Sequence, residues 1–341
     1  MALTLYDALI IGAGPAGLSA ALGLSRVHRT KVVFTRPLNA GFRNEGAHEM
    51  HNILSRDCTS PTEFRQISRD QINKYGTTEF VEAEITSVER VEQLENDKNI
   101  VPSHFKVIDT QGRKWQGRKL VLAMGSAEVL PTNIPGYREN WPHNIFQCLF
   151  CDGHERSHLP SGIIGFSPLH AHGAQMLNLL VTESSGPPTI FSNGPIPDGE
   201  DMQKALETVR ALGCHVDTGK ISNLEPASAP EVGVTVVFED GRRTKLGYLT
   251  DRPTTVLAGK HLIKQLGLEI ETHPIMGENI KGVELTGSTK VPGVFIAGDA
   301  STPLKAATNA ISSGSNTAAG ITQQLIAEDM QRLLASRNAS S

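Results

Sequence analysis

The chain has 341 residues and a formal net charge of -4, so it lacks the basic surface that nucleic acid or an anionic membrane would require. Its length exceeds what one hydrophobic core usually holds, so two domains are expected. Its four cysteines are too few for a secreted disulfide scaffold, and no run resembles the roughly 20 apolar residues of a membrane helix. We therefore expect a cytoplasmic protein that binds neither nucleic acid nor a membrane.

The N-terminal residues predict a strand, a glycine turn and a helix in direct succession. Leu5 to Ile11 is an apolar, β-prone run, and the sequence Gly-Ala-Gly-Pro-Ala-Gly of residues 12–17 opens a helix that reaches Leu24. A second strand, Lys31 to Thr35, follows the helix. A G-x-G-x-x-G motif in this context is typical of dinucleotide binding, and the alternative is a helix packed closely on a strand without a ligand.

Each glycine of this turn has a physical role in such a site. Gly12 allows the tight turn, Gly14 lets the backbone approach a pyrophosphate, and Gly17 lets the helix pack closely on the strand. The N-terminus of the helix, where Pro15 and Ala16 lie, offers N–H groups to the phosphates. We therefore predict cofactor contacts at all five of these positions.

The end of the second predicted strand lacks the acid that usually binds the ribose. Thr35 and Arg36 stand there instead. We place both beside the cofactor, but the ribose hydroxyls must find their acceptor elsewhere.

The loop-like residues 41–62 contain three potential metal ligands, His48, Glu49 and His51. No further ligand at metal spacing is evident, so we expect these three residues to line a cofactor pocket. Cys58 and Cys214 are each interpreted as buried or half-buried thiols.

A second strand-turn-helix begins near residue 162, so the nucleotide-binding architecture is repeated in a damaged form. Small residues are expected at the turn, but the chain has Gly165, Ser167 and His170. Residues 159–203 contain no Lys or Arg, and Ser192 and Asn193 offer neither a cation for a 2'-phosphate nor a carboxylate for a ribose. The two histidines 170 and 172 could bind an anion, although a turn that has lost its nucleotide is the simpler interpretation.

The C-terminal region predicts the other end of a flavin site. An apolar strand from Val294 ends in Gly298-Asp299, and a helix of small residues, Ala306 to Leu325, follows it with Ala307 in its first turn. Other strands are expected at residues 80–88, 104–109, 114–116 and 119–124. Asp299 could hold a ribityl hydroxyl, or it could merely cap the helix. With Gly125, which ends another buried strand, these residues complete the predicted cofactor site.

The domain prediction follows from these two ends of one site. Residues 1–118 and 251–341 form a discontinuous domain that holds the predicted flavin site, and residues 119–250 form an inserted domain that holds the damaged repeat; the resemblance described below implies that these bind FAD and are of the NAD(P)H-binding type, respectively. The fold class is α/β, with two Rossmann-like domains.

The inserted domain carries the sequence Cys148-Leu-Phe-Cys151, which we interpret as a redox pair. Zinc would need two more thiolate or imidazole ligands, and no second C-x-x-C exists. In thiol–disulfide exchange one cysteine meets the substrate and the other resolves the mixed disulfide. We assign Cys148 to the substrate and Cys151 to the flavin side.

Three residues after the pair could move the protons that accompany dithiol oxidation. His154 has an unperturbed pKa near neutrality, and Asp152 and Glu155 compete with it for the role of acid or base. One of the carboxylates could instead only orient His154, or all three could be ordinary polar residues of a helix.

Over nearly its full length the chain resembles the low-molecular-weight thioredoxin reductase superfamily. The resemblance implies an FAD domain, an inserted NADPH-type domain with the cysteine pair, and a homodimer. The residues that carry it are Gly12-Ala13-Gly14-Pro15-Ala16-Gly17, Ala123-Met124-Gly125-Ser126, Cys148-x-x-Cys151-Asp152-Gly153 and Ala297-Gly298-Asp299-Ala300.

The departures from that family decide the functional prediction. The intact second glycine turn and the basic HRR-type segment are absent, and Pro303-Leu304-Lys305 replaces the RQ dipeptide. Because it has His154 and lacks these features, the chain is more similar to the fungal dithiol oxidases that close disulfides in gliotoxin-like and holomycin-like secondary metabolites. We expect an FAD-dependent oxidase that takes a small-molecule dithiol and O2 and forms H2O2. The alternatives are an NADPH-dependent thioredoxin or disulfide reductase and a non-catalytic flavin-binding scaffold.

Overall fold

The structure is a computed structural model, and it describes residues 3–36, 41–92, 94–96, 99–101, 103–228 and 231–340. The chain divides into two compact units. The first comprises Met1–Glu45, Thr59–Glu128 and Thr255–Ser341, and the second comprises Gly46–Cys58 and Val129–Thr254. A parallel sheet forms the centre of each unit, as expected for an α/β fold with two Rossmann-like domains.

The division between the units differs from the predicted one. A boundary at residues 118 and 119 would cut strand β8 (Lys114–Leu122), which pairs with β1 (Leu5–Ile11) on both sides of that point. The two strands expected at 114–116 and 119–124 are thus one strand. The first unit continues to Glu128, and residues 46–58, expected beside the cofactor, belong to the second unit.

The first unit is built on a seven-stranded sheet with the order β3-β2-β1-β8-β7-β4, in which β21 also pairs with β8. Strands β1, β2, β3, β8 and β21 pair in parallel, while β4 and β7 pair antiparallel. The single strand expected at 80–88 is two strands. The remaining bounds in this sheet are Lys31–Thr35 for β2, Thr78–Glu82 for β3, Ile85–Val91 for β4, His104–Asp109 for β7 and Val294–Ile296 for β21.

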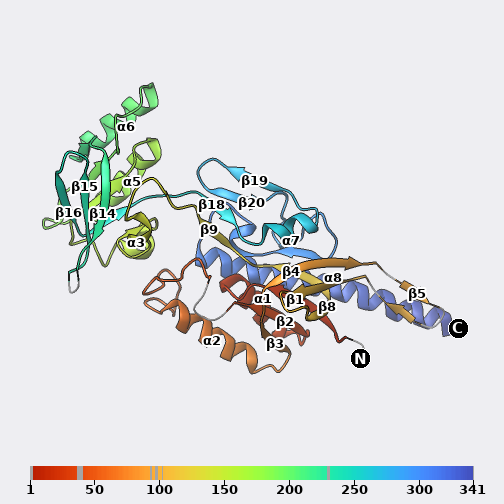
Figure 1. The fold of residues 1–341 in the computed structure, drawn as a ribbon. Helices are drawn as coiled ribbons and strands as arrows, with labels where there is room; N and C mark the ends of the chain where they lie inside the picture. The colour runs from red at the N-terminus through yellow and green to blue at the C-terminus, as the bar shows by residue number, and fades with distance from the viewer. Residues whose placement is uncertain are drawn as a thin grey trace. The chain divides into compact units, whose positions relative to one another are not determined.

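Strand β1 separates two hydrophobic cores because its side chains alternate between the faces of the sheet. Ala8 and Ile10 join the core that contains α1 (Pro15–Arg26) and α8 (Ala307–Ser340), whereas Leu9 and Ile11 join the other. The two helices pack on each other (Figure 1). Helix α8 also continues beyond Leu325, where its end was predicted.

The other elements of the first unit are helix α2 and several short pieces. Helix α2 begins after Ser60, whose side chain accepts a hydrogen bond from the N–H of Glu63 and so caps it. Three strand pairs, β9–β18, β19–β20 and β5–β6, are antiparallel. The bounds are Pro61–Asn73 for α2, Leu94–Asn96 for β5, Asn99–Val101 for β6, Ser126–Glu128 for β9, Thr255–Leu257 for β18, Lys260–Gln265 for α7, Ile270–His273 for β19, Gly277–Ile280 for β20 and Gly298–Ala300 for the 3-10 turn η1.

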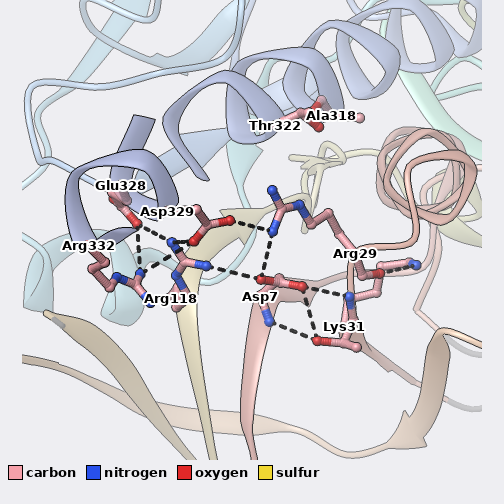
Figure 2. A network of polar contacts seen from close by, with 10 residues as sticks. Asp7, Arg29, Lys31, Arg118, Ala318, Thr322, Glu328, Asp329 and Arg332 are labelled. Carbon is pink, nitrogen blue, oxygen red and sulfur yellow. Dashed lines mark hydrogen bonds and ion pairs between the residues drawn. The ribbon is translucent and has the colours of Figure 1, made fainter. Parts of the chain in front are cut away.

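A network of charged side chains ties α8 to the sheet (Figure 2). The buried guanidinium of Arg118 on β8 lies 3.3 Å from Asp7 on β1 and 2.8 Å from both Glu328 and Asp329 on α8. Asp329 also pairs with Arg29 at 2.9 Å. Opposite charges with little solvent access hold one geometry more firmly than exposed pairs do, so α8 is fixed against β1 and β8.

The second unit has a five-stranded parallel sheet with the order β10-β17-β11-β12-β13 and an antiparallel sheet β14-β15-β16. The bounds are Tyr137–Asn140 for α3, Ile145–Phe146 for β10, Leu149–Asp152 for α4, Ser161–Ile164 for β11, Pro168–Asn178 for α5, Thr189–Phe191 for β12, Glu200–Ala211 for α6, His215–Asp217 for β13, Ile221–Pro226 for β14, Val234–Phe238 for β15, Arg243–Leu246 for β16 and Tyr248–Thr250 for β17. Among the helices in the described ranges, none is both long enough and apolar enough to span a bilayer.

Candidate functional site: a glycine turn and a redox disulfide

The first glycine turn lies between β1 and α1 and is closely packed at two of its three glycines. A Cβ atom at Gly12 would lie 2.3 Å from the carbonyl oxygen of Ala123, and one at Gly17 would lie 1.9 Å from that of Gly12. A Cβ atom at Gly14 would have nothing within 4 Å. The backbone at Gly14 therefore faces open space before the N-terminus of α1, which fits the approach of a pyrophosphate.

Pro15 and Ala16 lie in the first turn of α1 and differ in their surroundings. Pro15 occupies the first helical position, where its missing N–H costs no hydrogen bond. Ala16 is buried, and a Cβ atom at Gly298 would lie 2.9 Å from its Cβ. Ala16 therefore packs the turn against η1, so its part in a cofactor site is to bring Gly298 close.

The predicted flavin end contains Asp299 within a polar cluster of the first unit. Its Oδ2 accepts hydrogen bonds from Ser126 Oγ at 2.9 Å and from Arg43 Nη1 at 3.1 Å. Arg43 Nε donates to Glu128 Oε1 at 2.6 Å. Asp299 Oδ1 has no partner among the described residues, so one carboxylate oxygen remains for a ribityl hydroxyl, and the site fits FAD.

Sequence reasoning missed Arg43, Ser126 and Glu128 as members of this cluster. Arg43 lies in a stretch without periodicity, and its partner Asp299 is 256 positions away along the chain, so no local signal reports the contact. The amide of Gly298, which was predicted, donates to Ser313 Oγ at 2.8 Å. That bond connects the strand end to α8.

The other predicted cofactor residues also lie in the first unit, and their surroundings differ. Gly125 has a positive φ of 73° with open space beside it, and Ala307 is the first residue of α8. Thr35 Oγ1 donates to the carbonyl of Arg36 at 2.7 Å, and the Arg36 side chain lies over Gly41. The Thr35 hydroxyl proton is thus already used within the protein.

In the second unit Cys148 and Cys151 form a disulfide at the start of α4, with Cα atoms 5.2 Å apart. Cys148 is the N-cap, and its carbonyl accepts hydrogen bonds from the N–H groups of Cys151 and Asp152. Both cysteines are half-buried. Helix α4 is a single turn, so only this turn can stabilise a thiolate at its N-terminus.

The three candidate acid–base residues lie in different environments. Asp152 is half-buried, and burial raises the pKa of its carboxyl above the ordinary value. His154 is exposed, and Glu155 Oε1 lies 3.8 Å from His51 Nε2. Among the three, Asp152 therefore has the environment typical of a proton-transfer group.

Residues 46–58 pack against the segment that carries the redox pair. Asn52 Nδ2 donates to the carbonyl of Phe150 at 2.7 Å, and the ring of His48 lies 5.9 Å from that of His143. Cys58, expected to be buried, is exposed because this segment lies on the surface of the second unit, whereas Cys214 is buried as expected. No periodic pattern of residues predicts this contact.

The second glycine turn, between β11 and α5, is covered by a side chain. The position of a Cβ atom at Gly165 lies 2.6 Å from His170 Nε2, so the imidazole lies over the turn. His170 Nδ1 shares a 2.7 Å hydrogen bond with Ser167 Oγ, and its Nε2 lies 3.8 Å from Asp251. Asp251 in turn accepts a hydrogen bond from Tyr137. A ring and a carboxylate thus stand where a dinucleotide phosphate would approach.

One cation approaches the end of β12 from outside the segment that lacks Lys and Arg. A Cβ atom at Gly194 would lie 3.8 Å from Lys220 Cε. Arg242, the other nearby cation, is paired with Asp217 and Asp240. Among the residues that the structure describes beside Gly194, Lys220 is thus a cation on the ribose side of this unit, and the sequence reasoning did not consider it.

Comparisons with known proteins agree with this combination of sites. The profile of pyridine nucleotide-disulphide oxidoreductases matches residues 6–173. Thioredoxin reductase sirT of Leptosphaeria maculans is 34% identical, over 96% of this chain and 96% of its own length. Thioredoxin reductase aclD of Aspergillus oryzae is 32% identical, over 95% and 98%.

Solved structures extend the similarity to the fold. The crystal structure of HlmI is 28% identical with a TM-score of 0.83, and the match covers 98% of this chain and 97% of that one. An oxidoreductase from Agrobacterium tumefaciens is 28% identical with a TM-score of 0.79, over 95% and 99%.

A pair of glycine substitutions tests the cofactor turn. Gly14→Ala should fold but lose most of its FAD, because its Cβ atom would enter the space left for the pyrophosphate. Gly17→Ala should lose more than about 3 kcal/mol of stability, because its Cβ atom cannot fit against Gly12. Bound flavin per protein and thermal melting measure the two effects.

The control for this pair is Gly173→Ala in α5, where the nearest atom to a new Cβ lies 3.8 Å away. That variant should keep both its FAD and its melting temperature. If Gly14→Ala kept a full complement of FAD, the cofactor would not approach this turn.

Proposed function

The chain belongs to the pyridine nucleotide-disulphide oxidoreductase family and is a flavin disulfide oxidoreductase, and we propose that it acts as an oxidase of small-molecule dithiols. The expected family and the expected FAD cofactor are confirmed. In this proposal a dithiol is closed to a disulfide, and O2 is the final acceptor and gives H2O2. The direction of electron flow is the part that the following observations support.

The observation that carries the proposal is the covered second glycine turn. The imidazole of His170 lies over Gly165 and is held by Ser167, with the carboxylate of Asp251 beside it. A pyrophosphate needs free backbone N–H groups at such a turn, and a carboxylate repels it. This arrangement disfavours NAD(P)H as the electron source, so the electrons must enter from a thiol substrate.

The alternative is an NADPH-dependent disulfide reductase, and two observations favour it. The fungal relatives sirT and aclD are named thioredoxin reductases, and Lys220 near Gly194 could contact a 2'-phosphate. One lysine beside a covered glycine turn supports NADPH binding less than an open phosphate-binding turn would. We therefore rank this function second.

The chemistry at the cysteine pair is thiol–disulfide exchange. A thiolate of the substrate attacks Cys148 Sγ, the Cys148–Cys151 bond breaks, and Cys151 leaves as a thiolate. The second substrate thiolate then attacks the sulfur bound to Cys148, which releases the substrate disulfide and leaves both cysteines reduced. FAD, when bound, supplies the two-electron acceptor that restores the pair and passes the electrons to O2.

We assign the proton transfers to Asp152. Each substrate thiol must lose a proton before it attacks, and Asp152 directly follows the resolving cysteine in α4. Burial raises the pKa of this carboxyl, which makes it a stronger base than an ordinary aspartate. His154 is exposed, and we assign it a smaller part in catalysis.

The surroundings of the pair support a small apolar substrate. Phe150, between the two cysteines, is 74% exposed, and Leu54 on the neighbouring segment is 96% exposed. Such side chains cost free energy in water and gain it when a ligand covers them. A hydrophobic dithiol would provide that cover.

A homodimer also belongs to the proposal. Helix α8 exposes Ile326, Met330, Leu333 and Leu334 on its C-terminal half. Their spacing of four, three and one residues places them along one side of a helix, where a second copy could cover them.

Oxygen consumption tests the proposed direction. With dithiothreitol as the dithiol probe, the protein should consume O2 and form one H2O2 for each disulfide, while NADPH should support neither. Cys148→Ser should lose turnover by at least about 100-fold and keep FAD, because no disulfide is left for the substrate to attack. The control Cys214→Ser changes a buried free thiol and should turn over normally.

Two results would contradict this proposal. Turnover with NADPH but not with the dithiol would establish the reductase, and no turnover with either reductant would support a flavin-binding scaffold.

The pH dependence of flavin reduction tests Asp152. Burial raises the pKa of Asp152, so its base form is lost as the pH falls through a value above the ordinary aspartate range, and the rate should fall there. Asp152→Asn should remove this acid limb and slow reduction about 100-fold. His154→Gln should keep the limb; if His154→Gln lost it and Asp152→Asn kept it, the assignment would pass to the histidine.

A further inference from the structure

Residues 51–58 of the second unit contain a cluster of metal-ligating side chains that the redox chemistry does not use. His51 Nδ1 lies 3.5 Å from Asp57 Oδ1 and 3.9 Å from Cys58 Sγ. Cys58 Sγ lies 3.8 Å from Asp57 Oδ2. Nitrogen, oxygen and sulfur ligands thus face one another within a short surface segment.

The His51–Asp57 separation suits a shared ion better than a direct hydrogen bond, whereas the two contacts of Cys58 are long hydrogen bonds of its sulfur. A good hydrogen bond from nitrogen to oxygen spans about 2.7–3.2 Å, which is shorter than the 3.5 Å between His51 and Asp57. In a tetrahedral zinc site with bonds of about 2.0–2.3 Å, neighbouring ligand atoms lie about 3.3–3.6 Å apart. With one ligand atom from each residue, the three atoms lie within 4.8 Å of one another, so a contraction of about 1 Å would bring them onto one ion.

The surrounding residues orient two of the ligands. His51 Nε2, on the far side of the ring, lies 3.8 Å from Glu49 Oε2 and 3.8 Å from Glu155 Oε1. A carboxylate on the second nitrogen is the usual partner of a metal-bound histidine, because it fixes the ring and raises the basicity of the ligating nitrogen. Asp57 Oδ1 accepts the N–H of Asn52 at 2.9 Å, which fixes the carboxylate.

The cluster is open to solvent on one side. The side chain of His51 is 12% exposed, whereas that of Asp57 is 63% exposed. The carboxylates of Asp57 and Glu49 place negative charge near Cys58, and this charge attracts a divalent cation.

We propose that His51, Asp57 and Cys58 bind one divalent transition-metal ion of the Zn2+ class, with water as the fourth ligand. One imidazole, one carboxylate and one thiolate in a tetrahedron are typical zinc ligands, whereas Mg2+ and Ca2+ select oxygen ligands. Sequence reasoning rejected a metal here because it grouped His51 with His48 and Glu49. The other two ligands, Asp57 and Cys58, come close to His51 only in the folded segment.

A bound ion would stabilise the contact of residues 51–58 with the redox helix. Asn52 Nδ2 donates to the carbonyl of Phe150, and His51 faces Glu155. Linking His51 to Asp57 and Cys58 would hold both of these contacts in place. The site therefore gives the cell's zinc level a means to stiffen the surface next to the disulfide.

Cobalt spectroscopy on the oxidised, FAD-loaded protein tests the site without measuring activity. In this form Cys148 and Cys151 are joined in a disulfide and cannot bind metal. Titration with Co2+ should give a saturable absorption in the red, beyond the flavin bands, at one ion per chain, and Zn2+ should abolish it by displacement. Zn2+ should also raise the melting temperature by a few degrees.

Variants locate the ion. Cys58→Ser and His51→Ala should each weaken Co2+ binding at least about 10-fold, while Cys214→Ser should bind as the natural chain does. Retained FAD shows that each variant is folded. Full Co2+ binding by Cys58→Ser, or the absence of a stoichiometric band in the natural chain, would overturn the proposal, and slower labelling of Cys58 by a thiol reagent in the presence of Zn2+ would support it independently.

Discussion

The access of a phosphate group to a glycine turn is the constraint on which the functional interpretation depends. Both units have a strand, a turn and a helix arranged to bind a dinucleotide, but their turns differ in one respect. At Gly14 the backbone faces open space, whereas at Gly165 an imidazole lies over it. Since His170 is also hydrogen-bonded to Ser167, its displacement would cost a hydrogen bond before any phosphate bond formed. One turn is therefore suited to a cofactor and the other is not.

In the proposed function, this difference sets the direction of electron flow through the redox pair. A disulfide such as Cys148–Cys151 exchanges electrons with any thiol of suitable potential, and its geometry does not distinguish an oxidase from a reductase. What distinguishes them is the supply of electrons. Where the second dinucleotide site is covered, the remaining donors are thiols that reach the pair, and the exposed Phe150 beside it offers an apolar surface for a small one.

Much of the fold could be predicted because its signals are local. Strands β1 and β2 have the predicted bounds, since an apolar run followed by a glycine turn specifies a strand within a few residues. Contacts between distant segments could not be predicted. The pairing of Arg43 with Asp299 and the docking of Asn52 on Phe150 leave no periodic pattern in the sequence. The prediction that Cys58 is a buried or half-buried thiol was wrong, because composition does not show which loop forms the surface.

The central claim is that electrons enter through the cysteine pair and not through a nicotinamide cofactor. An anaerobic titration of the oxidised protein, followed by flavin absorbance, tests this most directly, because O2 cannot reoxidise the flavin during the measurement. We predict that a stoichiometric dithiol bleaches the flavin and that admitted air restores its absorbance with formation of H2O2. Rapid bleaching by stoichiometric NADPH would contradict the account.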